Sequence, residues 1–109
     1  MEVFFEDSRL AKKFESDQDL RRAYGTERAK KLRTRRAQLL TAETLDELRR
    51  GPGRCHELTG NYTGLLSLDL DGPYRLIFRP TEETDPKPDG GLDWTKVTSV
   101  VVTGVIDPH

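Results

Sequence analysis

Apolar residues in the first half of the chain recur at helical spacing, interrupted by residues that begin or end helices. Residues 3–5 form a short apolar run typical of a strand. Ser8 is a suitable N-cap for a first helix, because its hydroxyl can accept a hydrogen bond from a free backbone N–H. A second helix is expected to begin near residues 17–19 and to end before Gly25. The first half is therefore predicted to be a strand followed by helices.

A longer helix is expected from about Thr26 to Ala42, where apolar residues again follow a helical period. Its buried stripe is predicted to comprise Ala29, Leu32, Leu39 and Leu40. Its outer face is predicted to carry the basic residues Lys30, Lys31, Arg33 and Arg35. Thr44 and Glu47 then have capping-box spacing, which predicts a short helix that ends at residues 51–53.

After this helix the pattern changes to the alternation of apolar and polar residues that is typical of strands. The expected strands cover residues 55–58, 66–70, 74–79 and 96–106. Valines on both faces of the last stretch indicate an interior strand. Residues 80–94 are rich in proline, glycine and acidic residues and are interpreted as an exposed loop.

The turn of the central hairpin decides which side chains share a face. A two-residue Asp-Gly turn would place Leu68 opposite Arg75. A three-residue turn instead places Leu68 opposite Leu76 and Asp69 opposite Arg75, so that apolar residues and opposite charges pair. The three-residue turn is therefore predicted. The whole pattern indicates an α+β fold, one domain over residues 1–109, with an N-terminal strand and helices packed on one face of an antiparallel sheet.

Composition narrows the classes of function. Charged residues make up 34% of the chain, above the roughly 25% typical of soluble domains, and the net charge is −1. No stretch is apolar enough to span a membrane, and the amino terminus does not look like a secretion signal, so the cytoplasm is expected. Cys55 is the single cysteine, and zinc-ligand spacing, phosphate-binding loops and hydrolase motifs are all missing. No metal and no cofactor are therefore expected.

Basic residues gather in one segment of the predicted long helix. Residues 28–36 carry six basic side chains and no acidic one. Such a patch suits the phosphate backbone of a nucleic acid or an acidic protein partner. The alternative is an ordinary solvated helix face.

Polar residues on the predicted sheet offer a second candidate site. His56 lies in one strand, and Arg75 and Arg79 share one face of the next hairpin. His109 ends the sequence beside Asp107. Imidazole exchanges protons near neutral pH and guanidinium stabilises negative charge, so this set suits phosphodiester transesterification by a ribose 2′-hydroxyl. The alternative is that the strand histidine only satisfies a hydrogen bond and the terminal one has no role.

Several segments together resemble the HigB-like killer toxins of the RelE/ParE superfamily, which include proteins labelled plasmid maintenance system killer or killer suppression protein. The similar segments are ERAKKLRTR, TAETLDEL, RCHELTGNYTGLLSLDLDGPYRLIFRP and the terminal VIDPH. The resemblance implies a RelE/ParE-like fold and a toxin of a type II toxin–antitoxin system. It also implies a ribosome-dependent endoribonuclease that cleaves mRNA. The implied partners are the ribosome, mRNA and a helix-turn-helix antitoxin, with a higher-order complex of toxin and antitoxin on operator DNA.

The resemblance also assigns roles to individual residues. His56 falls on the strand histidine of these toxins, Arg75 on their sheet arginine, and Asp107 and His109 on their terminal acid and histidine. Two features depart from the family: Pro108 stands where an aromatic residue is common, and the isoelectric point is ≈ 6.1 rather than basic. The residues expected to contact RNA are Lys30, Lys31, Arg33, Arg35 and Arg79.

Two other functions stay open from the sequence. The chain could be a catalytically weak module that keeps the fold and the antitoxin interface. It could instead act like the ParE branch and inhibit DNA gyrase, which needs no nuclease histidines. The pair of His56 and His109 favours the nuclease over the gyrase inhibitor.

Overall fold

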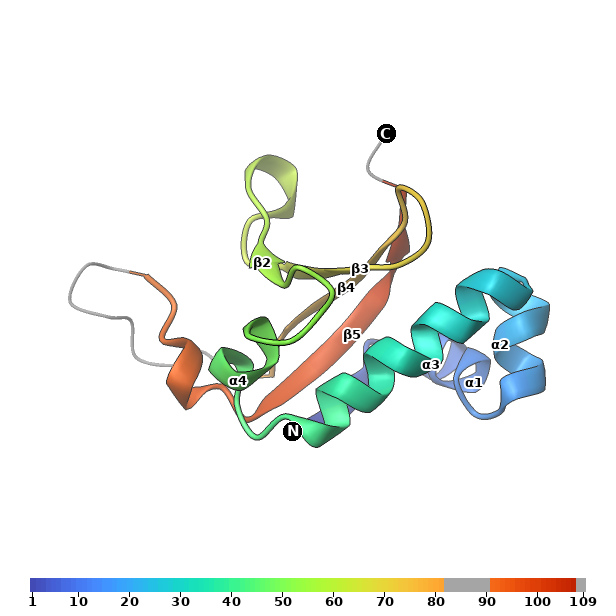
Figure 1. Ribbon diagram of the computed structural model, residues 1–109, viewed down its shortest axis with the longest axis horizontal. Helices are drawn as coiled ribbons and strands as arrows, with labels where there is room; N and C mark the ends of the chain where they lie inside the picture. The colour runs from blue at the N-terminus through green and yellow to red at the C-terminus, as the bar shows by residue number, and fades with distance from the viewer. Residues whose placement is uncertain (82–90, 108–109) are drawn as a thin grey trace.

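The structure is a computed structural model, and it describes residues 1–81 and 91–107. In this part of the chain five strands form one sheet in the order β1-β5-β4-β3-β2 (Figure 1). The strands are β1 (Glu2–Phe5), β2 (His56–Glu57), β3 (Leu66–Asp69), β4 (Arg75–Pro80) and β5 (Ser99–Ile106). Pro108 and His109 lie outside the described residues, as do residues 82–90 of the predicted loop.

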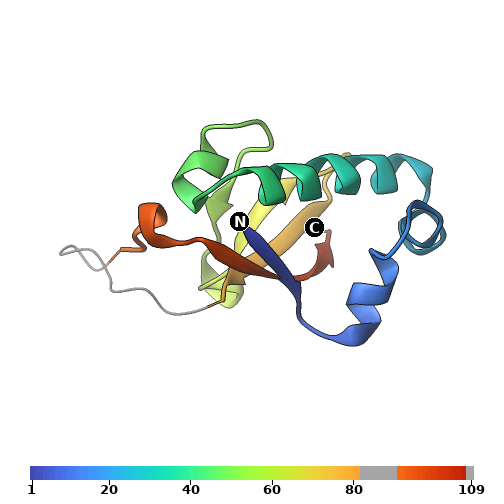
Figure 2. The ribbon, with the colours of Figure 1, turned by 90° about the horizontal axis from the view of Figure 1, so that it is seen from below.

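Helices cover one face of this sheet and extend beyond one of its ends (Figures 1 and 2). The helices are α1 (Ser8–Lys13), α2 (Asp17–Tyr24), α3 (Thr26–Thr41) and α4 (Leu45–Arg49), with 3₁₀ turns η1 (Gly60–Tyr62) and η2 (Trp94–Lys96). The α+β class predicted from the sequence is confirmed. No described helix has the length and apolar character that a membrane crossing requires.

The sheet is mixed rather than antiparallel, which corrects one part of the prediction. β1 pairs with β5 in parallel, with Val3 opposite Val100, whereas β4 and β5 run antiparallel. A hydropathy pattern records which residues face the core but not the direction in which a strand runs. The position of β5 between β1 and β4 confirms the interior strand that its valines predicted.

The central hairpin has the predicted register. Leu68 pairs with Leu76 and Asp69 with Arg75, and the Leu70 N–H donates to the Tyr74 carbonyl oxygen at 3.0 Å. The three-residue turn keeps the leucines of the hairpin and Phe78 on the face that α3 covers. This register sends the alternate side chains, which are polar apart from Ile77, to the opposite face.

The side of helix α3 that is buried against the sheet differs slightly from the predicted side. Ala29, Leu32 and Leu39 are buried as expected, but Leu40 is 52% exposed and Arg35 only 8%. Residues 32, 35 and 39 follow one another at helical spacing on one side, and residue 40 lies about 100° further round. Leu40 was therefore wrongly placed in the core, and Arg35 was wrongly placed on the surface.

The predicted loop after β4 ends earlier than expected, because Trp94 docks into the fold. Its indole is 8% exposed, its Nε1 donates to Glu57 Oε1 at 3.1 Å, and the Arg49 guanidinium lies 5.0 Å from its ring centroid. These contacts of Trp94 fix β2 and α4 next to each other at one end of the sheet.

The N-cap of α1 is Asp7 rather than the predicted Ser8.

Candidate functional site

The polar residues of the hairpin lie on the sheet face turned away from α3, which we call the far face. Strand side chains alternate between faces, and the leucines of β3 and β4 belong to the core under α3. The residues between them therefore point the other way. The far face is defined by Ser67, Asp69, Arg75, Ile77 and Arg79.

His56 reaches the far face from the edge strand β2. It pairs with Ser67 across the ladder, and its Nε2 lies 3.5 Å from Ser67 Oγ. Its Nδ1 lies 3.1 Å from the Glu57 carbonyl oxygen. A carbonyl oxygen can only accept, so this contact favours the tautomer with the proton on Nδ1 and leaves Nε2 as a base. His56 is exposed and does not face the helices.

Arg75 is held by a carboxylate on the neighbouring strand. Its Nε lies 3.1 Å from Asp69 Oδ1, and both side chains are about one-fifth exposed (20% and 22%). Its Nη1 also donates to the Tyr74 carbonyl oxygen at 3.1 Å. These contacts fix the guanidinium in one orientation on the same face as His56, with β3 between their two strands.

The other predicted sheet residues lie around this pair. Ile106 pairs with Arg75, so Asp107 directly follows the end of β5 that lies beside Arg75. Arg79 lies on the far face beyond Ile77, and its Nη2 is 3.6 Å from Glu6 Oε2. His109, the predicted terminal histidine, lies outside the described residues.

The basic residues of α3 do not join this site, because α3 lies on the other side of the sheet (Figure 2). Lys30 and Lys31 are exposed, and Arg33 forms an ion pair with Asp17 of α2. Arg35 is buried, which contradicts its predicted contact with RNA. Its place in the core stripe brings its guanidinium to the backbone of β3, where Nε donates to the Asp69 carbonyl oxygen at 2.7 Å.

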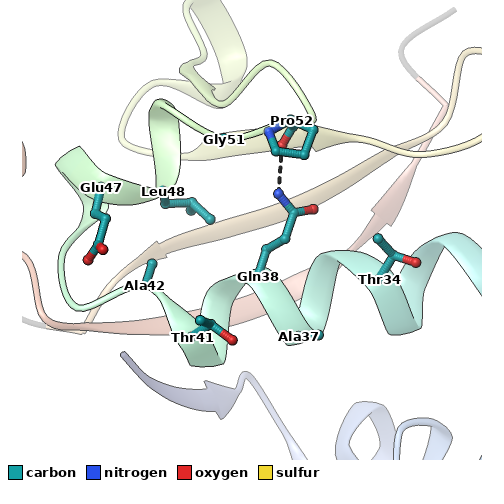
Figure 3. A pocket seen from close by; sticks show the side chains of 9 residues that line it. All are labelled: Thr34, Ala37, Gln38, Thr41, Ala42, Glu47, Leu48, Gly51 and Pro52. Atoms are coloured by element: carbon teal, nitrogen blue, oxygen red, sulfur yellow. Dashed lines mark hydrogen bonds between the residues drawn. The ribbon is translucent and has the colours of Figure 1, made fainter.

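Metal and thiol chemistry find no support in the described residues. No group of three or more His, Cys, Asp or Glu side chains lies together there. Burial raises the pKa of Cys55 to about 12, so its thiol stays protonated and unreactive. A hollow of ≈ 570 Å³ lies between α3 and α4, on the helix side of the sheet (Figure 3). Glu47 is its one charged lining residue in the described part of the chain.

Sequence reasoning missed two residues of this region. Ser67 was treated only as a polar spacer between leucines, yet it lies under the His56 imidazole and is fully buried. Arg54 was not considered, yet its Nε lies 2.7 Å from Asp69 Oδ2. The predicted pairing of Asp69 with Arg75 already gave that carboxylate a cation, so it carried no signal for Arg54.

The chain thus has a small α+β fold with a helix layer on one sheet face (Figure 2) and His56 and Arg75 on the other. The comparison with family models identifies the family: the HigB-like toxin model, described as the RelE-like toxin of type II toxin–antitoxin system HigB, matches residues 3–85. The chain therefore belongs to the HigB-like toxin family. No curated protein and no solved structure matches the chain. Membership in a type II toxin family implies a protein antitoxin as partner.

Proposed function

We propose that this toxin is a ribosome-dependent endoribonuclease that cleaves mRNA. The observation that carries the proposal is the arrangement of His56 and Arg75 on the far face. The histidine presents Nε2 beside Ser67, and the arginine is oriented by Asp69. A base and a fixed cation on one surface are what transesterification at a phosphodiester requires.

In the proposed reaction, His56 Nε2 removes the proton of a ribose 2′-hydroxyl. The 2′-oxygen attacks the adjacent phosphorus, and the bond from phosphorus to the 5′-oxygen breaks, which leaves a 2′,3′-cyclic phosphate. Arg75 stabilises the added negative charge of the phosphorane. The leaving 5′-oxygen takes its proton from His109, with Asp107 beside it, as the resemblance to the toxin family implies. Removing a group that stabilises such charge lowers kcat roughly 10²–10³-fold.

We further propose that basic surface residues bind ribosomal RNA or mRNA. Lys30 and Lys31 are exposed on α3, and Arg33 and Arg79 are in ion pairs with partly exposed carboxylates. Exposed ion pairs contribute little energy, so a phosphate can replace the carboxylate. The same helix face could receive acidic side chains of the antitoxin, which would then block the ribosome. A complex of toxin and antitoxin on operator DNA belongs to the same proposal.

The test is cleavage of mRNA on translating ribosomes, with mapping of the new ends. The wild-type protein should produce defined cuts in translated mRNA, and His56→Ala and Arg75→Ala should reduce cleavage at least 10²-fold. Arg21→Ala is a matched control, because Arg21 is an exposed arginine of α2 paired only with Asp17 among the described residues. Intact mRNA with altered DNA supercoiling would instead indicate a gyrase inhibitor. Intact mRNA and normal supercoiling would indicate a binding module.

A further inference from the structure

The backbone at Arg54 is strained in a way that places its side chain beside Asp69. Arg54 has a φ of 50°, and within residues 1–81 and 91–107 it is the one non-glycine residue with a positive φ. This left-handed conformation is unfavourable for a residue with a Cβ. Strain of this kind persists only where surrounding contacts enforce it, and it is common at functional sites.

The segment before Arg54 is hydrogen-bonded to β3 at Asp69, a residue that also binds a buried arginine of α3. Arg35 Nε donates to the Asp69 carbonyl oxygen at 2.7 Å, and the Asp69 N–H donates to the Gly53 carbonyl oxygen at 2.8 Å. Gly53 has a φ of 107°, and a Cβ there would lie 3.1 Å from Arg35 Nε. The close approach therefore requires glycine at this position.

A glutamine of α3 completes the attachment. Gln38 Oε1 accepts from Arg35 Nη1 at 2.7 Å, and Gln38 Nε2 donates to the Pro52 carbonyl oxygen at 2.8 Å (Figure 3). Two side chains of α3 thus bind backbone carbonyl groups, one on the loop at Pro52 and one on β3 at Asp69. These contacts fix the backbone of Pro52 and Gly53. The side chain of the residue that follows them, Arg54, is directed toward the Asp69 carboxylate.

The result is a carboxylate between two guanidinium groups. Asp69 Oδ2 lies 2.7 Å from Arg54 Nε, and Asp69 Oδ1 lies 3.1 Å from Arg75 Nε. The three side chains carry a net positive charge. The Arg54 side chain is 71% exposed, and a guanidinium has five N–H donors, so donors remain for a ligand after the contact with Asp69.

Stability alone does not account for this arrangement. An ion pair with so exposed a partner contributes little to folding, and it would not offset the strained backbone. A planar guanidinium is, however, well suited to bind a phosphate through two parallel hydrogen bonds. Arg54 lies two residues before His56, and Asp69 lies on β3, between the strands that carry His56 and Arg75. The proposed reaction needs the RNA backbone to be held there.

We propose that Arg54 binds a phosphate of the RNA substrate next to the one held by Arg75, with Asp69, Arg35 and Gln38 as positioning residues. The inference rests on the proposed nuclease function. It adds a substrate-binding residue that lies outside the histidine–arginine pair, and it gives a reason for the left-handed backbone.

The experiment measures mRNA cleavage on programmed ribosomes and the salt dependence of binding to the same ribosomes. Arg54→Ala should raise KM roughly 10-fold or more, as expected for a lost hydrogen bond from a charged group, and should change kcat much less than Arg75→Ala. The slope of log Kd against log salt should fall by about one. Arg54→Lys should restore part of the salt slope but less of the KM, because lysine lacks the paired donors.

The matched control is Arg50→Ala, because Arg50 is an exposed arginine on the same loop and pairs with Asp46 at 2.8 Å. Both variants should unfold at the same denaturant concentration as the wild type. If the wild type cleaves mRNA and Arg54→Ala matches Arg50→Ala in KM and salt slope, the inference is wrong and the proposed function stands. If the wild type neither cleaves mRNA nor binds ribosomes, the proposed function fails, and this inference fails with it.

Discussion

We predict that Arg35→Ala lowers the free energy of unfolding by about 2–4 kcal/mol. Arg35 is 8% exposed, and it donates to the Asp69 carbonyl oxygen and to Gln38 Oε1, each at 2.7 Å. A hydrogen bond from a charged group contributes roughly 1.5–3 kcal/mol, and alanine would leave both acceptors unpaired. The desolvation of the arginine charge opposes these gains and keeps the total below their sum.

The measurement is urea unfolding followed by far-ultraviolet circular dichroism, with the midpoint and slope compared between variants. Arg33→Ala is the control, since Arg33 belongs to the same basic segment and forms a surface pair with Asp17. That change should cost roughly 0–1 kcal/mol. Arg35→Lys should cause a loss of unfolding free energy between those of Arg35→Ala and Arg33→Ala, because one ammonium group cannot reach both acceptors well. Equal urea midpoints for Arg35→Ala and Arg33→Ala would refute the argument, because Arg35 would then contribute no more to stability than a surface arginine does.

Three further predictions concern other parts of the molecule. Leu68→Ala, at a position that is 0% exposed, should lower the free energy of unfolding in urea by about 2–5 kcal/mol. Leu40→Ala, at 52% exposure, should lower it by less than about 1 kcal/mol. Equal losses would show that Leu40 is buried and that the side of α3 assigned to the core is wrong. Burial raises the pKa of Cys55 from 9.0 to about 12, so the folded protein should react slowly with iodoacetamide. Its stability should fall as the pH rises from 9 toward 12, because the thiol ionises first in the unfolded chain. Rapid labelling without denaturant would contradict this. Lys30→Ala with Lys31→Ala should weaken ribosome binding more at low salt than at high salt and leave the unfolding midpoint unchanged; normal binding at every salt concentration would remove α3 from the mechanism.

The hairpin could be predicted in detail because two independent patterns agreed on one register. Leucines had to share a face, and Asp69 had to oppose Arg75. The same register placed Arg75 on the face away from the helices, so the orientation of that candidate residue followed from the sequence. For His56, the alternation of a two-residue strand is too short to fix a face, and the structure supplied the pairing with Ser67.

Other features could not be read from the sequence, because they depend on contacts between distant segments. The direction of β1 depends on how the chain returns to β5, and a short apolar run looks the same in either direction. The left-handed backbone at Arg54 follows a loop that two distant residues hold, Gln38 through the Pro52 carbonyl and Asp69 through the Gly53 carbonyl. Hydropathy assigns arginine to the surface, and only the packed structure reveals a guanidinium that satisfies buried carbonyl groups.

The basic segment of α3 therefore holds side chains in two different environments, which its composition does not distinguish. Lys30 and Lys31 point to solvent and remain candidates for binding the ribosome. Arg35, on the inner side of the same helix, binds the backbone of Asp69, whose carboxylate orients Arg75 on the far face.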